Sequence, residues 1–464
     1  MNRTLCLAIL LCCFLTAPRV FAQKVKIGSV VLQGNKITRE VVILRELPFS
    51  IGDSVATEDL PQLLERAKEN IYNLSLFNFV NVTPVLDTLQ HNEVQICLDL
   101  AERWYVWPVV EARIEERNLS TWMQNFDFSK VTVEAGVRVN NFFGLKHKLI
   151  VTARGGYQWG LFFGYRDIAL GTNRRHFLGL DVSANTSHNI DAYTAEDKPA
   201  RFNISDVNLE EQLQTRINYT YRSSIRESHN LSFIHTATVL ADTVLKLNPQ
   251  YWGDDHTTRN AFRLNYWYLM DQRDYHKYPL DGYYIKSGIN SYITADNSVR
   301  YLQVLLGLQY YKKFTDRWMA SSVFNGGFSV SNKQAYILEH AIGYGSAMLR
   351  GYEYTVADGQ SYFTSNNTLK FCLLKEKVYT MGWLNWLPKF NKIPIAIYVN
   401  AHFDMGYAYN KWYRASNLLS NQLLFAYGAG IDIVTYYDMV IGVDFARNKQ
   451  GRNGYYFSIK VPFL

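Results

Sequence analysis

From residue 131 to the C-terminus, apolar and polar side chains alternate in a series of long segments. Clear examples cover residues 131–139, 302–310, 393–405 and 439–445. An alternation of period two predicts β-strands with one apolar and one polar face. Strands of a soluble sandwich are usually shorter than many of these segments, whereas a tilted membrane strand needs about ten residues. The pattern therefore predicts strands that close into a barrel, which leaves no unpaired backbone in lipid.

The number of such segments indicates the size of the barrel. About ten precede a long loop at residues 331–358, and about five follow it. Since outer-membrane barrels normally have an even number of strands, we expect one more strand in the polar stretch 185–212 and about sixteen in all. The predicted fold class is membrane all-β, a sixteen-stranded antiparallel barrel over residues 130–464 preceded by one small α/β domain.

That small domain occupies residues 23–102, where the periodicity is different. An apolar strand near residues 25–32 ends at Gly34-Asn35, and helices are expected to begin at Thr38 and Thr57. Two further strands follow near residues 77–83 and 93–100. Residues 103–129 show no clear pattern and are interpreted as a linker.

The first 22 residues are typical of a signal peptide. Arg3 precedes an apolar run over residues 5–15, and small or apolar residues lead to a cleavage site before Gln23. Leu11 precedes Cys12, which argues against a lipoprotein. Only Cys97 and Cys372 lie beyond this segment, and two cysteines do not make a disulfide framework.

Composition narrows the class of protein. Aromatic residues make up 15% of the chain, yet no later apolar stretch approaches the ~20 residues of a membrane helix. Barrels place aromatic side chains at both membrane interfaces. The net charge of +7 includes Arg3 and Arg19, so it falls to +5 without the signal peptide. The basic residues are scattered along the chain, and we expect no nucleic-acid partner.

The sequence offers no recognisable catalytic constellation. It lacks a zinc-binding His-Glu-x-x-His helix, a phosphate loop, a Cys-x-x-Cys pair and a Gly-x-Ser-x-Gly elbow. No strand or turn histidine stands in a nucleophile setting; those considered are His147, His188, His235, His276 and His402. We therefore predict neither an enzyme nor a cofactor or metal site.

The amino-acid sequence of several segments resembles the BamA/TamA superfamily of outer-membrane assembly and translocation proteins. Residues 31–35, 44–47 and 74–80 are similar to a POTRA domain of the surface-antigen type, and Pro279 and Gly282 are similar to the turn before a mid-barrel strand. The resemblance implies a Gram-negative outer-membrane protein with its POTRA domain in the periplasm. Multiple POTRA domains are usual in this family, whereas this chain has one.

The resemblance also points to a loop motif and a strand motif. The loop motif falls on Arg350, Gly351 and Tyr352, and the strand motif on Phe403, Asp404 and Gly406. We expect the loop to fold into the lumen, with Arg350 against the barrel wall. Asp404 lies on the polar face of its strand and is the best carboxylate partner for this guanidinium.

A lateral seam is the second predicted site. Strand one, expected at residues 130–140, would close the barrel against the last strand, at residues 454–463. Pro462 cannot donate a ladder hydrogen bond, so this seam is expected to be short. The residues assigned to it are Glu134, Gly454, Ser458, Pro462 and Phe463.

These features favour an assembly factor that inserts clients into the outer membrane through the seam, since strand edges attract other strands. The expected partners are unfolded outer-membrane or surface proteins, membrane lipids, and accessory assembly proteins at the POTRA domain. The alternative is a transporter that passes one polypeptide through its lumen. A passive pore with a plug loop is a third reading, and the sequence does not identify the client.

Overall fold

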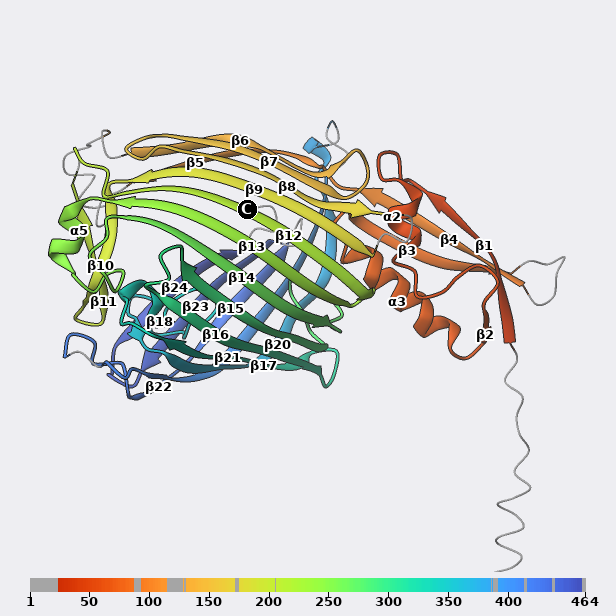
Figure 1. Ribbon diagram of the computed structural model, residues 1–464. Helices are drawn as coiled ribbons and strands as arrows, with labels where there is room; N and C mark the ends of the chain where they lie inside the picture. The colour runs from red at the N-terminus through yellow and green to blue at the C-terminus, as the bar shows by residue number, and fades with distance from the viewer. Residues whose placement is uncertain are drawn as a thin grey trace, which may run out of the picture.

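A small α/β module and a large curled sheet make up the chain, which we describe from a computed structural model (Figure 1). The predicted signal peptide lies outside the described residues. The structure describes residues 24–86, 93–114, 128, 131–171, 175–204, 206–384, 386, 391–412, 415–435 and 439–460.

The N-terminal module is a four-stranded sheet covered by two helices. Its strand order is β2-β1-β4-β3, in which only β1 and β4 are parallel. Both helices bury apolar residues against the sheet, among them Ile43 and Ile71, which share one cluster with Leu98 of the sheet. The elements are β1 (Lys24–Gln33), α2 (Glu40–Leu44), β2 (Ser54–Ala56), α3 (Leu60–Tyr72), β3 (Phe77–Leu86) and β4 (Glu93–Glu102).

The first helix is shorter than its sequence suggests. The Thr38 hydroxyl does not cap it; this group lies 2.9 Å from both the Tyr105 hydroxyl and the Asn141 amide nitrogen. The helix starts at Glu40, after Arg39, which makes no side-chain cap. Thr38 therefore links the module to the strands that follow it.

The large sheet contains sixteen antiparallel strands, as the alternating pattern predicted. Each strand pairs with the next barrel strand along the chain. The strands are β5 (Val106–Ile114), β6 (Val131–Phe142), β7 (His147–Gly156), β8 (Gly160–Leu170), β9 (His176–Ser187), β12 (Glu210–Ser224), β13 (Glu227–Leu240), β14 (Thr258–Asp271), β15 (Gly282–Thr294), β16 (Arg300–Lys313), β17 (Trp318–Ser331), β20 (Ser361–Thr380), β21 (Lys392–Tyr409), β22 (Leu423–Thr435), β23 (Met439–Asn448) and β24 (Asn453–Lys460).

The linker prediction for residues 103–129 is wrong, because β5 lies inside it and pairs with β6 along its whole length. The sixteenth strand was expected within residues 185–212 instead. Residues 106–110 form a continuous apolar run that includes Pro108, so the alternation of β5 is hidden in the sequence. A proline is tolerated at the edge of a sheet, and β5 is an edge strand of this one.

Alternate residues of each strand face opposite sides of the barrel. On β21 the outward Phe403 is exposed, whereas the inward Asn400, His402 and Asp404 are buried. Among the described residues, none of the helices has both the length and the apolar character needed to cross a bilayer.

The end of the barrel far from the module is capped by a hairpin and a short helix, at the left of Figure 1. The hairpin pairs β10 (Asn189–Ala195) with β11 (Lys198–Asn203), and the helix is α5 (Asp242–Leu247). At the hairpin tip, the Asp197 carbonyl accepts a hydrogen bond from the Val356 backbone N–H at 2.8 Å. The cap is thereby tied to the loop that enters the barrel.

The turn between β14 and β15 packs on the inner wall at the module end of the lumen. Tyr278 of this turn is buried, and its hydroxyl donates a 2.7 Å hydrogen bond to Asp432 of β22. Lys370 of β20 lies 3.8 Å from the centre of the Tyr278 ring. Gly282 adopts φ +102°, and a Cβ there would lie 2.2 Å from the Gln272 carbonyl oxygen, so the turn requires glycine.

Candidate functional site

The loop between β17 and β20 runs inside the barrel and packs on its wall. It contains a 3₁₀ turn, η2 (Tyr336–Leu338), and two short paired strands, β18 (His340–Ile342) and β19 (Ala357–Asp358). Its apolar side chains form a buried cluster with residues of β21, β22 and the segment between them. The cluster comprises Ala341, Ile342, Leu349, Tyr352, Ala357, Ala408, Leu419, Leu424 and Ala426.

Arg350 at the tip of the loop forms a two-pronged ion pair with Asp404 of β21. Its Nε and Nη2 atoms lie 2.7 and 2.6 Å from the two carboxylate oxygens. Nη2 also donates to the Thr368 hydroxyl at 3.0 Å, and the Asn366 amide donates to Asp404 at 2.9 Å. The Asp404 side chain is fully buried and the Arg350 side chain is 22% exposed. The carboxylate therefore depends on this guanidinium and on neighbouring polar groups for its solvation.

Two glycines allow the loop to approach the wall this closely. A Cβ at Gly406 would lie 2.8 Å from the Leu349 Cδ1 atom and 3.0 Å from the Phe363 carbonyl oxygen. Gly351 adopts φ +85°, and a Cβ there would lie 3.0 Å from that of Ala426.

Gly351 and Tyr352 also form hydrogen bonds with the barrel wall. The Gly351 carbonyl accepts a hydrogen bond from the Asn448 amide of β23 at 2.8 Å. The Tyr352 hydroxyl donates to the Phe425 carbonyl at 3.3 Å. The structure thus brings the expected Arg350, Gly351, Tyr352, Asp404 and Gly406 together.

Phe403, which the strand motif groups with Asp404 and Gly406, does not face the loop. Phe403 immediately precedes Asp404 on a strand, so its side chain points to the opposite, outer face of the barrel. The sequence interpretation missed Asn366, Thr368 and Asn448, which complete the site. The only signal for them was polar side chains at inward positions of β20 and β23.

The seam lies between β5 and β24, the two ends of the sixteen-stranded sheet. Gly454 and Ser458 lie on the edge strand β24 and pair with Ala446 and Gly442 of β23. Pro462 and Phe463 fall outside the described residues. Within the part of the chain that the structure describes, no strand pairing joins β24 to β5.

Glu134 is not at this edge, so its assignment to the seam is wrong. It lies on the second strand, β6, opposite Glu111 of β5. Its carboxylate binds the Arg154 side chain of β7 at 2.7 Å. Because the sequence pattern did not reveal β5, the seam was expected one strand away from the true edge of the sheet.

The module is fixed to the barrel by a buried ion pair that joins residues distant in sequence. Both guanidinium Nη atoms of Arg222, in the β12–β13 turn region, lie 2.8 Å from the carboxylate oxygens of Glu46. Nearby, Arg226 binds Glu69 at 2.8 Å. Burial alone would raise the pKa of Glu46, but the adjacent Arg222 outweighs it and holds that pKa below its ordinary value of 4.5.

We expect Glu46→Gln to loosen the module from the barrel. The Glu46 side chain is only 3% exposed, so the substitution leaves Arg222 partly buried without its counter-ion, at a cost of roughly 3–5 kcal/mol. Because the folded pKa is lowered, the wild-type pair stabilises docking above pH ~4.5 and loses this effect as the pH falls through the folded pKa. Hydrogen exchange across α2 and the β12–β13 turn measures docking. Glu65→Gln, which breaks an exposed pair with Lys68, is the control.

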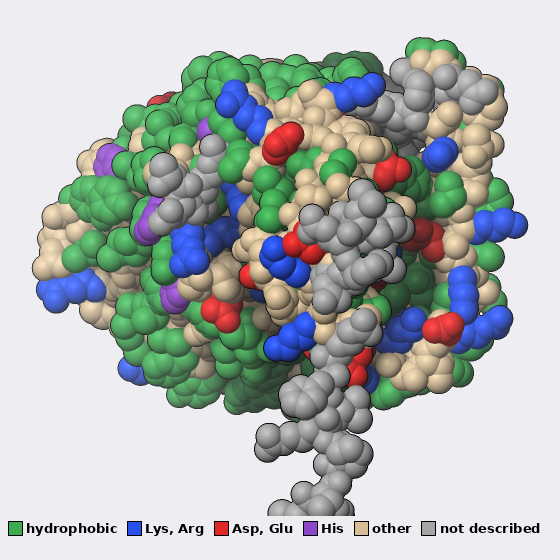
Figure 2. Space-filling model, turned by 90° about the vertical axis from the view of Figure 1, so that its right-hand side faces the viewer, with side chains coloured by type: hydrophobic (Ala, Val, Ile, Leu, Met, Phe, Trp, Pro, Cys, Tyr) green, Lys and Arg blue, Asp and Glu red, His purple; other side chains and the backbone are tan. Residues whose placement is uncertain are grey.

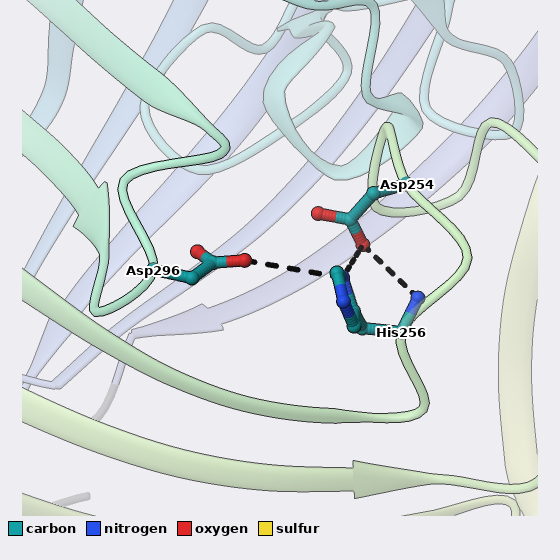
Figure 3. A group of neighbouring side chains, drawn as sticks. All are labelled: Asp254, His256 and Asp296. Atoms are coloured by element: carbon teal, nitrogen blue, oxygen red, sulfur yellow. Dashed lines mark hydrogen bonds and ion pairs between the residues drawn. The ribbon is translucent and has the colours of Figure 1, made fainter.

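A group of titratable side chains joins two loops at the capped end (Figure 3). His256 Nδ1 lies 3.6 Å from an Asp254 oxygen and 3.9 Å from an Asp296 oxygen. The Asp254 carboxylate is already bound by Arg259 at 2.6 Å and by the Ser298 hydroxyl at 2.9 Å. We therefore assign these contacts to loop pairing and no ion to the group.

The surface seen from the module end separates two kinds of side chain (Figure 2). Hydrophobic side chains cover broad areas along the left, upper and lower outline. Lys, Arg, Asp and Glu are concentrated over the middle and right. This distribution suits a barrel whose wall contacts lipid and whose module lies in water.

The comparisons place the chain in a known family. The sequence model of the Omp85 superfamily domain matches residues 141–459, and the POTRA model described as "Surface antigen variable number repeat" matches residues 25–103. The chain belongs to the Omp85 superfamily, with one POTRA domain before an outer-membrane β-barrel. No curated protein sequence is a significant match.

Several solved structures are similar to this chain at low sequence identity. CdiB from Escherichia coli is 11% identical with a TM-score of 0.51, over 94% of this chain and 76% of that one. BamA from Haemophilus ducreyi lacking POTRA domains 1–3 is 13% identical with a TM-score of 0.49, over 94% and 83%. CdiB from Acinetobacter baumannii is 14% identical with a TM-score of 0.48, over 94% and 73%.

Proposed function

We propose that this protein is an outer-membrane assembly factor that inserts client proteins through the seam between β5 and β24, with its POTRA domain in the periplasm. The observation that carries the proposal is the exposure of these two edge strands. Outward-facing Val110, Tyr455 and Phe457 are 78%, 78% and 67% exposed, compared with 46% for Val304 on an interior strand. An edge without a neighbour offers its backbone groups to a client strand.

Two segments inside the lumen support a route through the seam more than one through the barrel. The loop that carries Arg350 packs on the inner wall, and Tyr278 occupies the periplasmic end. A transporter for a single polypeptide would first have to displace both segments.

The free edge of the POTRA sheet is the proposed entry point for clients. Strand β3 is the last strand of that sheet, and its residues 78–81 line a groove of about 610 Å³ against the barrel. Lys392 and Val434 form part of the barrel side of this groove. An extended segment could add to β3 through backbone hydrogen bonds and then lie beside the barrel's periplasmic rim.

We expect deletion of residues 24–100 to leave a folded barrel that no longer supports its clients. The barrel sheet pairs internally from β5 to β24, so its ladders do not need the module. Heat-modifiable migration on gels checks folding, and complementation of a depletion strain checks function. Full activity of the truncated barrel would exclude a role for the POTRA domain in client delivery.

Depletion of the full-length protein followed by an inventory of outer-membrane proteins tests the function itself. Broad loss of barrel proteins is expected for an assembly factor. Loss of a single secreted polypeptide, with other barrels unchanged, would assign the protein to secretion instead.

A further inference from the structure

The outer wall of the barrel carries a groove on the strands that lie behind the Arg350 site. Its volume is about 630 Å³, and its lining comes from β16, β17, β20 and β21. In the strand register, Tyr310, Ser322, Asn367 and Phe403 form one transverse row. Because two short side chains stand between two large aromatic ones, the wall is hollowed at this level.

The next row towards the periplasm continues the hollow. Ala320 and Ala401 flank Leu369, and Lys312 stands at the β16 end of the row. The accessible surface inside the groove is mainly hydrocarbon. A single acyl chain is the shape that such an open, apolar furrow on a lipid-facing wall accommodates.

The two outward-facing polar side chains in the middle of the groove, Ser322 and Asn367, are hydrogen-bonded within the protein. The Ser322 hydroxyl donates to the Asn367 side-chain oxygen at 2.8 Å. The Asn367 amide donates to the Ser365 hydroxyl and to the Phe403 carbonyl, both at 3.1 Å. A hydrocarbon chain can therefore lie over Asn367 without stranding an unpaired donor.

The periplasmic end of the groove is basic. Lys312, Lys313, Arg317 and Lys375 lie near this rim, where Lys312 contacts Asp281 at 3.8 Å and Lys375 contacts Asp316 at 2.7 Å. Lys313 shares Asp316 at 3.3 Å, so cations outnumber carboxylates among these residues.

An aromatic pair marks the membrane interface at the same level. The rings of Trp318 and Phe371 are 5.0 Å apart, and Arg317 lies over Phe371 at 5.8 Å. Aromatic side chains gather at the headgroup level of membrane barrels. The cations beside this pair therefore lie where the headgroups of the periplasmic leaflet are found.

We propose that this groove binds an anionic phospholipid of the periplasmic leaflet, with one acyl chain over Ala320 and Ser322 and the headgroup phosphate at Lys312. The site goes beyond client insertion and does not depend on it. It shares the segment 366–368 with the loop site, since Asn366 and Thr368 bind Asp404 and Arg350 on the inner face.

Native mass spectrometry of the full-length protein, titrated separately with phosphatidylglycerol and phosphatidylethanolamine, tests the proposal. Wild type should retain one phosphatidylglycerol in preference to phosphatidylethanolamine. Ala320→Trp fills the groove and should abolish this preference. Ala184→Trp, at an outward position on β9 facing Leu161 and Leu213, is the matched control and should retain it.

The charge is tested separately, because Ala320→Trp could impair folding. Lys312→Gln should weaken phosphatidylglycerol binding about fivefold, the effect of one basic residue at a membrane surface. Lys246→Gln on α5, at the capped end, should have no effect. Equal binding of both lipids by wild type, or undiminished phosphatidylglycerol binding by Lys312→Gln, would overturn the proposal. A photoreactive residue at position 320 that captures only protein in native membranes would also overturn it.

Discussion

Arg350→Ala and Asp404→Ala are each expected to abolish most function and to lower the heat resistance of the barrel. Either change leaves one partner of a two-pronged ion pair without its counter-charge, and the Asp404 side chain is fully buried. Truncating one member of a buried pair costs roughly 3–5 kcal/mol. Water in the lumen lowers this figure, because the Arg350 side chain is 22% exposed. Complementation of a depletion strain and the unfolding temperature on gels are the measurements.

The double variant separates a direct interaction from two independent roles. If the two side chains act on each other, Arg350→Ala/Asp404→Ala should be little worse than either single variant. Arg350→Lys should fall between wild type and alanine, because an ammonium group keeps the charge but lacks the planar fork of two nitrogens that binds both carboxylate oxygens. Arg201→Ala, which breaks an exposed pair on the capping hairpin, is the control and should behave as wild type. Strictly additive losses in the double variant would show that the pair does not couple.

The barrel could be predicted from the sequence because lipid and lumen impose a period of two on every strand. The pattern failed at β5, where a continuous apolar run over residues 106–110 hides the alternation. This run contains Pro108, which an edge strand tolerates because one side of its ladder has no partner to satisfy. The same rule that located most strands therefore concealed the strand that forms the seam.

The loop site could be predicted in part, because the family resemblance and the alternation of side chains along the strand both pointed to the Asp404 carboxylate. The same alternation places the Phe403 side chain on the outer face, since adjacent residues of a strand cannot face the same side. Asn366 binds Asp404 while its neighbour Asn367 faces lipid, and two consecutive asparagines give no sign of which one turns inward. The register of β20 against β21 determines which of the two asparagines faces the lumen.

Contacts between distant segments were beyond prediction from sequence. Glu46 and Arg222 are separated by 176 residues, and each is an ordinary charged residue in its local pattern. Their pairing depends on how the module docks on the barrel turns. No periodicity or turn signal carries that information.

Cross-linking β5 to β24 is expected to abolish function, because clients would enter the membrane between these strands. The design uses Val110→Cys on β5 with Tyr455→Cys or Phe457→Cys on β24, in a Cys97→Ser/Cys372→Ala background. All three positions face outward and are strongly exposed. A disulfide requires the two Cα atoms to approach within about 7 Å, so its formation under a lipophilic oxidant also reports that the edges meet.

A staple between interior strands distinguishes loss of the seam from a general effect of oxidation. Val304→Cys/Phe328→Cys joins direct register partners on β16 and β17, which already share a ladder. This control should keep full activity when oxidised, whereas the β5–β24 staple should lose activity and regain it on reduction. The contrast follows from the sheet itself. Interior strands stay paired during insertion, whereas the two edge strands must separate to admit a new strand. Activity that survives a complete β5–β24 staple would rule out insertion through the seam.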